Sequence, residues 1–488
     1  MIPYTLALDC GSTHFKAALF DESLHRLAEA KLPVQSLAYR TDRIELGAEE
    51  IWQSTLELIR LTCQQAGLDT SQVAQFSITS QAQTFLLVDE TGAPITPLIS
   101  WLDSRAKALV PQLQHALGKD FAHHCSFASP LAELQLAKLL WLRKHSPELV
   151  DRARLIAPLP TWLALRLGGV AAIDDNIAAM SGLYSLHTRG YWRSALELCG
   201  VPESKLPGLV KAGTPIWVNQ ACPELALSPQ TVIILAGNDQ TCGAYGNGCR
   251  AGVADKEHPW ADKEHPWADK EHPWIATLGT ALVVYRLAGP TPGPYHPSGC
   301  WGPYPGGGYY ELAVQNYGCA ALDWALKILF PGQELTAFFS CAQSVADIWQ
   351  AVHPFFYPDQ MGSPSAWVGV GSQPERAMAV LEGIGFNLRR LVFDELDAGE
   401  SVESGFEKLI VTGGGSRNDF WMQLLADILD VPIQRGFGDG LLGAAWLASP
   451  DVKPPQNFKP QTWLPDIAKV AFYRDQYEQW CKCHRIIN

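Results

Sequence analysis

The sequence predicts an α/β fold that is organised in two halves. Apolar runs of strand length alternate with amphipathic helical segments, which is the pattern of a sheet covered by helices. A strand followed by a glycine turn occurs near the N-terminus and again near the C-terminus. The chain has 488 residues, more than one hydrophobic core usually organises, and 47% of them are hydrophobic. We therefore expect two large domains with a ligand site in the cleft between them.

The N-terminal half alternates predicted strands with a helix. Apolar runs at Thr5–Asp9 and Phe15–Asp21 predict two strands, and a polar turn that contains a glycine joins them. Glu49 to Cys63 places its apolar residues on one face at helical spacing, with glutamates where the helix begins. Val73–Ser80 and Phe85–Asp89 predict two further strands.

The C-terminal half repeats this organisation. Lys408–Thr412 predicts a short strand, and Gly413-Gly414-Gly415 predicts the turn after it. Asp419–Leu429 predicts a helix, because its apolar residues recur at helical spacing. Each half therefore carries a glycine turn directly after a strand.

Charge and composition exclude several classes of partner. The formal net charge is −13, whereas nucleic-acid binders need a concentrated basic surface. No apolar run approaches the roughly 20 residues that a membrane-spanning helix needs. We expect no nucleic-acid partner and no membrane partner. A small phosphate ligand stays compatible with an acidic protein, because a few backbone N–H groups and one lysine suffice to hold it.

The N-terminus and the cysteines predict a cytoplasmic protein. Residues Met1 to Asp9 lack a basic segment, and Asp9 ends their apolar stretch too early for a signal peptide. The 12 cysteines are scattered along the chain. Only Cys481 and Cys483 lie close together, and a C-x-C pair alone is weak support for a metal site. Reduced thiols in the cytoplasm are the simpler interpretation.

A tandem repeat lies between the two halves. The seven residues Ala-Asp-Lys-Glu-His-Pro-Trp occur at 254–260, 261–267 and 268–274. The period of seven suggests a coiled coil, but the proline in each copy interrupts a helix. The three histidines and their neighbouring carboxylates are candidate metal ligands. We favour a hydrophilic tandem expansion that forms a solvated loop.

The first chemical motif is the turn after the first strand, Asp9-Cys10-Gly11-Ser12-Thr13 followed by Lys16. The glycine lets the backbone approach a phosphate closely, and the turn N–H groups and hydroxyls donate hydrogen bonds to it. The carboxylate of Asp9 is suited to hold magnesium through water. The alternative is an ordinary β-hairpin with polar residues in its turn.

The second motif is Gly237-Asn238-Asp239-Gln240, which follows the apolar run Val232–Leu235. An aspartate in a glycine-containing turn beyond a buried strand is placed to project into a cleft. Phosphorylation of a sugar needs a base that accepts the hydroxyl proton. The alternative is an aspartate that hydrogen-bonds to its own turn.

Two further glycine turns are candidates for contact with a nucleotide. Thr277-Leu278-Gly279-Thr280 precedes an apolar strand at Ala281–Tyr285 and is suited to contact phosphate oxygens. Gly413-Gly414-Gly415 continues into Ser416-Arg417-Asn418, and bare glycine backbone lets a flat ring such as adenine lie against it. Each is equally compatible with a tight structural turn.

Together these elements occur in an order that resembles the FGGY carbohydrate kinases, which share the actin and ribonuclease H-like ATPase fold. The resemblance runs from about Tyr4 to about Ala448. Trp101-Leu102-Asp103-Ser104-Arg105 looks like the family's W-x-D-x-R motif near the sugar. Arg376 to Phe386 is similar to the family's R-A-x-x-E-G-x-x-F helix, and Gly443-Ala444-Ala445 to its late G-A-A motif.

The resemblance implies two ribonuclease H-like, actin-like ATPase domains with a cleft between them. Residues 1–245 would form the sugar-binding and catalytic domain, and 276–488 the nucleotide-binding domain. Residues 246–275 would be a linker that contains the three repeats. Because many relatives form dimers, a homodimer is a further expectation.

Matching positions imply roles for individual residues. Asp239 falls on the family's catalytic base, and Asp9 would help to hold magnesium. The sugar would be bound by Gln83, Thr84, Trp101, Asp103 and Gln240. ATP would be bound by Gly11, Ser12, Thr13, Lys16, Gly279, Thr280, Gly414, Gly415 and Asn418.

The sugar-side motifs depart from the well-known members. Gln83 stands where xylulokinases have a histidine, and Ala281 where the family often has a serine. Met361 to Pro364 lacks the arginine of the family's G-E-R-x-P, and the N-Q-R-E-T motif of glycerol kinases is absent. The pocket looks closer to a branch with an S-Q-x-Q-T pattern, here Ser80 to Thr84.

The resemblance favours an ATP-dependent kinase of a small sugar or polyol, with a pentulose such as xylulose or ribulose as the expected substrate. One alternative is a catalytically weak, actin-fold protein that binds ATP and regulates a partner. Asp239 disfavours it, since such a protein has no need of that carboxylate. A second alternative is a chaperone-like ATPase. The Trp101–Arg105 and Arg376–Phe386 motifs disfavour it, because both belong to the sugar kinase pattern.

Overall fold

The computed structural model describes residues 4–39, 42–219, 222–250, 274–293, 299–346, 354–396, 408–452 and 461–487. The chain forms two compact units, each assembled from three segments. Unit 1 contains Met1–Trp267, Leu287–Glu311 and Gly438–Phe458. Unit 2 contains Ala268–Arg286, Leu312–Phe437 and Lys459–Asn488. Residues 254–273 of the tandem repeat lie outside the described residues, and its last residue, Trp274, begins a strand. The predicted α/β class with two domains is confirmed.

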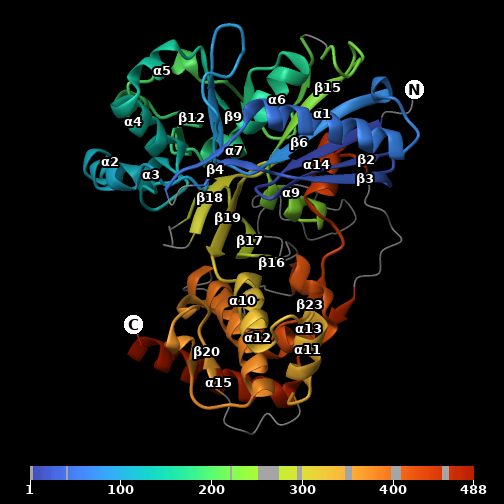
Figure 1. Cartoon of the computed structure of the whole chain (residues 1–488), viewed down its shortest axis with the longest axis vertical. Helices are drawn as coiled ribbons and strands as arrows, with labels where there is room; N and C mark the ends of the chain where they lie inside the picture. The colour runs from blue at the N-terminus through green and yellow to red at the C-terminus, as the bar shows by residue number, and fades with distance from the viewer. Residues whose placement is uncertain are drawn as a thin grey trace. The chain divides into compact units, whose positions relative to one another are not determined.

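A six-stranded sheet forms the centre of unit 1 (Figure 1). Its strand order is β14 (Pro215–Trp217), β15 (Val232–Asn238), β6 (Val73–Ser80), β1 (Tyr4–Cys10), β2 (His14–Phe20) and β3 (Arg26–Pro33). The three central strands β15, β6 and β1 are parallel to one another, while β2, β3 and β14 are antiparallel to their neighbours. The carboxyl ends of the three parallel strands therefore lie at the same edge of the sheet.

Helices cover both faces of this sheet. Leu6 and Leu8 of β1 pack with α1 (Ala48–Gln65) and α6 (Leu159–Gly168) in one hydrophobic core. On the opposite face, Ile234 of β15 packs with Ala448 of α14 (Gly440–Ala448), and the Ser77 hydroxyl donates to the Ala444 carbonyl. Since successive side chains of a strand point to opposite faces, both faces of the central strands are buried.

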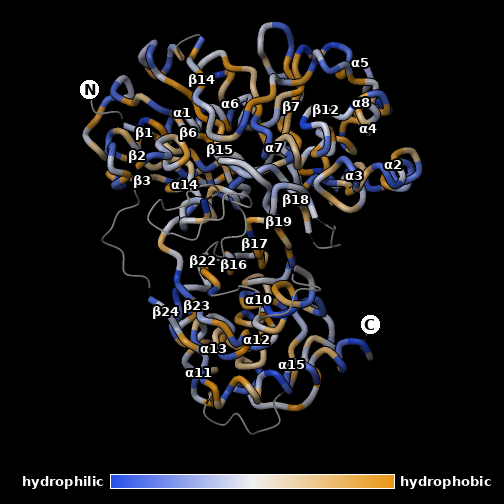
Figure 2. Tube along the Cα trace, turned by 180° about the vertical axis from the view of Figure 1, so that it is seen from behind, coloured by the Kyte–Doolittle hydropathy of each residue, from blue (hydrophilic) through white to orange (hydrophobic). Residues whose placement is uncertain are grey.

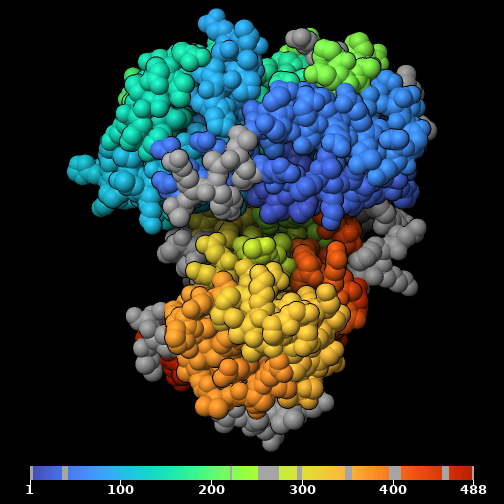
Figure 3. Space-filling view, in the orientation of Figure 1, coloured from blue at the N-terminus to red at the C-terminus, as the bar shows by residue number. Residues whose placement is uncertain are grey.

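The remaining elements of unit 1 surround the central sheet. A five-stranded sheet has the order β4 (Ser36–Tyr39), β5 (Ile44–Leu46), β8 (Leu98–Ile99), β7 (Phe85–Val88) and β9 (Leu155–Pro158). Further helices are α2 (Val110–Leu117), α3 (Asp120–His124), α4 (Gln135–His145), α5 (Pro147–Arg152), α7 (Asp175–Ala179), α8 (Arg193–Cys199) and α9 (Asp239–Gly246). Short strands are β10 (Ala172–Asp174), β11 (Tyr184–Ser185), β12 (Gly190–Tyr191), β13 (Gly208–Val210) and β18 (Gly299–Pro303). Figure 3 shows one face of unit 1, where the N-terminal segments in blue lie beside the teal segments that contain α2 and α3.

Unit 2 places helices around its own strands. Its strand β16 (Trp274–Leu278) is antiparallel to β17 (Leu282–Ala288) and parallel to β22 (Leu409–Thr412), with β23 (Ile433–Arg435) and β24 (Thr462–Trp463) beyond β22. The other elements are β19 (Tyr309–Gln315), which begins in unit 1, β20 (Phe355–Phe356), β21 (Trp367–Val368), α10 (Cys319–Leu329), α11 (Leu335–Gln343), α12 (Gln373–Arg389), α13 (Asp419–Leu429) and α15 (Ile467–Ile487). The core centres on α12 and α13, and Figure 2 shows the hydrophilic C-terminal end of α15 in blue.

Most predicted elements are confirmed at nearly the predicted bounds. The predicted strand Val73–Ser80 and the predicted helix Asp419–Leu429 match β6 and α13. One prediction was wrong in its local structure: Asp239 does not lie in a turn but is the first residue of α9. The reason is that the Asn238 side chain caps this helix by accepting from the Thr241 N–H at 2.8 Å. Among the described residues, no helix is both long and apolar enough to cross a bilayer.

Candidate active site

The central sheet of unit 1 aligns three candidate motifs at one edge. Cys10 of β1 pairs in register with Ser80 of β6, and Ser80 pairs with Asn238 of β15. The next residues of these three strands are Gly11, Gln81 and Asp239. Ligands of open α/β sheets bind beyond the carboxyl ends of parallel strands. The phosphate turn, the Ser80–Thr84 segment and the expected base therefore meet where a ligand site is expected.

The turn between β1 and β2 holds the predicted phosphate-binding residues. Asp9 and Lys16 face each other across the two strands, and the Lys16 ammonium donates to Asp9 Oδ2 at 3.1 Å. Gly11 is tightly placed, since a Cβ there would lie 3.0 Å from the His14 carbonyl oxygen. Ser12 is partly buried, whereas Thr13 is exposed.

One carboxylate oxygen of Asp9 is available for a ligand. Asp9 Oδ1 is buried and has no hydrogen-bond partner among the described residues. Burial raises the pKa of Asp9, and the charge of Asp439 acts in the same direction, while Lys16 opposes both. A buried oxygen without a partner is costly unless a cation or a donor satisfies it. The chemistry of this oxygen fits a magnesium site.

Asp239 has the electrostatic properties of a base. It is partly buried at the start of α9, and its Oδ1 accepts from the Gln240 N–H at 2.9 Å. Burial and the nearby negative charge of Asp9 raise the pKa of Asp239 to about 7, against smaller opposing effects of the Gln240 hydrogen bond and Lys16. A pKa near neutrality suits a residue that must accept and release a proton at physiological pH.

The Lys16 ammonium interacts electrostatically with three nearby carboxylates. Partial burial acts to lower its pKa, but the carboxylates of Asp9, Asp439 and Asp239 raise it more, so the pKa of Lys16 lies above its usual value. The ammonium therefore stays charged near neutral pH. Less than half of the side chain is exposed, at 43%.

Sequence reasoning missed the start of α14. The Asp439 carboxylate caps this helix through the Leu442 N–H at 2.9 Å, and Arg26 Nη2 donates to both of its oxygens at 2.7 and 2.8 Å. A Cβ on Gly440 would lie 3.6 Å from the Asp239 carbonyl oxygen and 3.9 Å from Asp9 Oδ2. The aspartate before the apolar run at 441–448 was a signal for the helix start. Nothing in the sequence pointed to Arg26.

Gln83 has a strained backbone beside the sheet edge. Its φ is 65°, in the left-handed region that few residues other than glycine adopt. Its side-chain amide donates to the Met180 carbonyl at 3.0 Å. Strained residues tend to lie at functional sites, where the surrounding structure holds them in place.

Thr84 and Trp101 connect the sugar-side motifs with the phosphate turn. Thr84 is buried; its hydroxyl donates to Gln81 Oε1 at 3.2 Å and accepts from the Trp101 N–H at 2.9 Å. The Trp101 indole N–H donates to the Ser12 hydroxyl at 2.9 Å. A hydrogen-bonded chain therefore runs from the Ser80–Thr84 segment through Trp101 to the phosphate turn.

Asp103 is more deeply buried than we expect of a residue that contacts a ligand directly. It is fully buried, and Oδ1 accepts from the Arg105 Nε–H and N–H at 2.8 and 3.1 Å. Its Oδ2 accepts from the Ile44 N–H and from Arg105 Nη2 at 2.8 and 2.7 Å. These bonds position the 101–105 segment. A direct bond to sugar would have to replace one of them, and the predicted sugar contact stays a prediction.

In unit 2 the two predicted nucleotide turns lie together. Gly413 has a φ of 88°, and a Cβ there would lie 2.5 Å from the carbonyl oxygen of Leu278, the residue before Gly279. Gly415 is equally confined, with Leu278 Cβ and the Trp421 ring within 3.0 Å of an added Cβ. Gly414 instead faces open space, with nothing within 4 Å of an added Cβ. Gly414 is thus the glycine of this turn that leaves room for a ligand.

Thr280 and Asn418 border this pair of turns. Thr280 is exposed, and its carbonyl accepts from the Gly318 N–H at 3.1 Å, at the start of α10. The Asn418 side chain caps α13 by accepting from the Trp421 N–H at 2.9 Å. The oxygen of Asn418 is therefore engaged in the helix cap.

The structure thus brings the predicted residues together in two groups. Asp9, Gly11, Ser12, Thr13, Lys16, Gln83, Thr84, Trp101, Asp103, Asp239 and Gln240 belong to unit 1, and Gly279, Thr280, Gly414, Gly415 and Asn418 belong to unit 2. The described residues of 4–487 contain no cluster of three or more His, Cys, Asp or Glu residues that would hold a metal ion by itself.

The structure thus shows two α/β units, with candidate glycine turns and carboxylates at the ends of their strands. Residues 4–246 match the N-terminal domain of the FGGY family of carbohydrate kinases, and residues 275–450 match its C-terminal domain. The chain belongs to the FGGY family and is a carbohydrate kinase.

Individual relatives agree with this assignment. Glycerol kinase of Janthinobacterium sp. (strain Marseille) is 27% identical over 467 residues, which cover 92% of this chain and 90% of that protein. The fold is similar to crystal structures of xylulose kinase and gluconate kinase from Lactobacillus acidophilus, with TM-scores of 0.84 and 0.83. Each structure is 21% identical in sequence, and each match covers 100% of this chain and 98% of the other.

Proposed function

We propose that this carbohydrate kinase transfers the γ-phosphate of ATP to a hydroxyl of a small sugar or polyol, with Asp239 as the catalytic base. The observation that carries the proposal is the position of Asp239. It lies at the sheet edge that also holds the phosphate turn, with a pKa raised to about 7 by burial and by Asp9. The alternative of a catalytically weak, ATP-binding regulatory protein is not favoured, because such a protein needs no carboxylate at this position.

Asp239 would accept the proton of the attacking hydroxyl as the phosphoryl group arrives. At neutral pH a pKa of about 7 leaves a large share of the carboxylates ionised, and proton transfer from the hydroxyl becomes more favourable as the pKa of the base rises. The N-cap Asn238 and the Gln240 N–H hold Asp239 at the start of α9. The rest of the catalysis in such transfers is positioning and charge stabilisation.

Asp9, by holding magnesium, and Lys16 would place positive charge beside the phosphates. Asp9 Oδ1 has no partner among the described residues and would hold magnesium, directly or through water. When bound, magnesium supplies positive charge to the phosphate oxygens. The Lys16 ammonium, held at 3.1 Å from Asp9 Oδ2, adds a second positive charge at the same turn.

We propose that residues of both units bind the substrates. Gly11, Ser12 and Thr13 would bind the terminal phosphates from unit 1. From unit 2, the Gly279–Thr280 turn would contact phosphate, and Gly414, Gly415 and Asn418 would border the adenosine. The open space at Gly414 supports the adenosine part of this proposal.

A pentulose is the proposed acceptor. Among the similar proteins are a glycerol kinase, a xylulose kinase and a gluconate kinase, each named for a small polyhydroxylated molecule. The sugar would lie against Gln83, Thr84, Trp101, Asp103 and Gln240. The strained backbone of Gln83 supports a functional role for this segment. The Gln83 amide is suited to bind sugar hydroxyls, since an amide both donates and accepts hydrogen bonds.

The boundaries that we propose for the domains are 1–245 and 276–488, joined by 246–275. The two family matches end at 246 and begin at 275, which supports a boundary in this region. A homodimer is the proposed assembly, and light scattering of the purified protein measures it.

A substrate screen tests the proposal. Purified protein with magnesium and ATP is assayed for ADP release against pentuloses, hexuloses, polyols, aldoses and gluconate, with Asp239→Asn beside it. We expect one class of these compounds to stimulate ADP release. In the variant, the rate of this release should be about 10²–10⁴-fold lower. Thermal unfolding should show that the variant is at least as stable as the wild type, because it removes a buried carboxylate beside Asp9. ATP binding without turnover on any member of the panel would contradict the proposal.

A further inference from the structure

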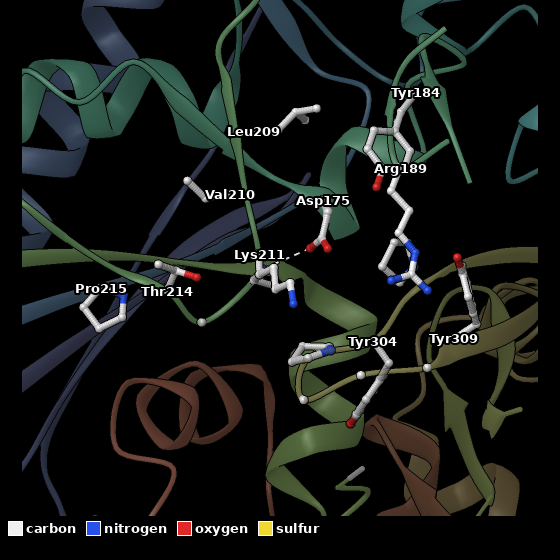
Figure 4. A pocket seen from close by; sticks show the side chains of 17 residues that line it. Asp175, Tyr184, Arg189, Leu209, Val210, Lys211, Thr214, Pro215, Tyr304 and Tyr309 are labelled. Carbon is white, nitrogen blue, oxygen red and sulfur yellow. Dashed lines mark hydrogen bonds between the residues drawn. The ribbon is translucent and has the colours of Figure 1, made fainter. Parts of the chain in front are cut away.

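Unit 1 contains a cavity that includes none of the predicted site residues (Figure 4). Its volume is about 600 Å³, within the range of small-molecule sites. Three segments line it: the 209–215 connection between β13 and β14, the β11–β12 hairpin and the turn between β18 and β19 at 303–309. Asp175 of α7 forms a further part of the wall.

The cavity carries more positive than negative charge. Lys211 and Arg189 are exposed and extend their nitrogen atoms into it, as Figure 4 shows. Asp175 is the only carboxylate among the lining residues, and its Oδ1 accepts from the Ala212 N–H at 3.0 Å. Burial raises the pKa of Asp175, while the Ala212 hydrogen bond and Lys211 oppose the rise. The lining therefore carries two cationic side chains and one carboxylate.

Aromatic rings form the rest of the wall. Tyr184, Tyr304 and Tyr309 line the cavity, and the Arg189 guanidinium lies 6.0 Å from the centre of the Tyr309 ring. The hydroxyls of Tyr304 and Tyr309 donate to the backbone carbonyls of Cys249 and Leu186. These hydrogen bonds hold the Tyr304 and Tyr309 rings in place as buried parts of the cavity wall. The wall is therefore apolar on this side, as is common where C–H groups of a sugar pack.

We propose that this cavity is an accessory site for a sugar phosphate and that its occupancy acts on the phosphoryl-transfer site through α7. Lys211 and Arg189 bind the phosphate, and the apolar wall to which the tyrosines contribute lies against the carbohydrate. Lysine and arginine are the side chains that bind phosphate best. The effect on transfer rests on the proposed roles of Asp239 and Gln83, whereas binding in the cavity does not.

The short helix α7 connects the cavity with the base. Asn176, next to Asp175, is fully buried, and its Oδ1 accepts from the backbone N–H and the side-chain amide of Asn238 at 2.9 and 2.7 Å. Its own amide donates to Thr241 Oγ1 at 3.0 Å and to the carbonyl of Pro303, a residue of the cavity wall, at 2.9 Å. A shift of α7 or of Pro303 therefore moves the residue directly before Asp239.

The other end of α7 reaches the sugar-side segment. Met180 follows the last residue of α7, and its carbonyl accepts from the Gln83 side chain at 3.0 Å. One five-residue helix thus joins the cavity at Asp175 to Asn238, the residue directly before the proposed base, and to Gln83. This contiguous hydrogen-bonded path is the physical basis of the coupling.

Calorimetry without ATP tests the binding step. Ribulose 5-phosphate, glucose 6-phosphate and inorganic phosphate are titrated into wild type, Lys211→Glu and the charge-matched control Lys327→Glu, on an exposed position of α10 in unit 2. We expect at least one sugar phosphate to bind saturably, with affinity at least tenfold weaker in Lys211→Glu and unchanged in the control. No saturable binding, or equal loss in both variants, would overturn the proposal. Equal affinity for inorganic phosphate would overturn the assignment to a sugar phosphate.

Hydrogen–deuterium exchange tests the coupling without turnover. We expect the bound sugar phosphate to slow exchange of backbone amides in 175–180 and 237–241 of the wild type and not of Lys211→Glu. Unchanged exchange in both segments, with binding intact, would overturn the coupling. Both measurements are independent of catalysis. If the protein phosphorylated no sugar, the proposed function would be wrong, but the binding and exchange results would still decide whether the accessory site exists.

Discussion

Asp239 illustrates how the environment of one side chain decides its chemistry. Burial and the carboxylate of Asp9 favour its neutral form and raise its pKa to about 7. The Gln240 hydrogen bond and Lys16 favour the ionised form and limit the rise. The balance is a carboxylate whose charge changes within the physiological pH range, although aspartate ordinarily titrates near pH 4.

The expected pH dependence of turnover follows from the pKa of Asp239. Only the ionised carboxylate accepts a proton, so we expect kcat/KM to be level above about pH 7 and to fall about tenfold per pH unit below it. Because a cation near Asp9 favours the ionised form of Asp239, higher magnesium should move the midpoint to lower pH.

Initial rates between pH 5 and 9 at fixed magnesium measure this profile, with thermal unfolding at each pH as the control for loss of fold. A profile that stays level down to pH 5 would show that Asp239 is not the group whose ionisation limits the reaction.

At the scale of elements, α9 and α14 pack through glycines. A Cβ on Gly443 would lie 1.7 Å from the Cys242 carbonyl oxygen, and a Cβ on Gly246 would lie 2.5 Å from the Asp439 carbonyl oxygen. The two helices therefore approach each other more closely than any side chain allows. The late G-A-A motif thus has a packing role in this chain: its glycine lets α14 lie against the helix that begins with Asp239.

Gly443→Ala tests this packing. The added methyl group has no room against backbone, so we expect the free energy of unfolding to fall by about 2–3 kcal/mol. The displaced α9 should also lower kcat. Gly414→Ala is the matched control for stability, since a Cβ there meets nothing within 4 Å. Denaturant unfolding of both variants measures the difference, and equal stability would show that the helices separate at little cost.

At the scale of the whole molecule, the function needs residues that are far apart in the chain. Unit 1 takes its α14 from residues 440–448, close to the end of the family match, and packs it on β6 through the Ser77–Ala444 hydrogen bond. The proposed base, the candidate phosphate turn and α14 therefore belong to one unit, although more than 400 residues separate Asp9 from Asp439. Truncation before residue 440 would remove part of the site and not merely a C-terminal tail.

The tandem repeat is predicted to be dispensable for this organisation. Deleting residues 261–274 leaves one copy of the heptapeptide and keeps a tryptophan directly before Ile275. Shortening this connection by 14 residues changes its closure free energy by about 1 kcal/mol or less. We expect kcat, KM for ATP and the unfolding temperature to stay close to those of the full chain. A tenfold change in either kinetic constant would show that the repeat takes part in function.

Much of the local structure around the candidate site could be predicted from short-range patterns. The turn after Asp9, the strand before Asp239 and the three glycines at 413–415 are local signals, because strand ends and glycine turns depend on neighbouring residues. The depth of Asp103 could not be predicted. Its four hydrogen bonds come from Ile44 and Arg105, and only the folded sheet places Ile44 beside it.

The sequence by itself determined the α/β class, the order of the elements and the family, because hydrophobic periodicity and motif order are properties of the chain. Only the tertiary structure decided which side chains meet. The Arg26–Asp439 pair, the Asn176–Asn238 network and the contact of Gly443 with Cys242 join segments that lie far apart in the sequence. Such contacts depend on strand register and helix approach, and both are settled only when the whole core packs.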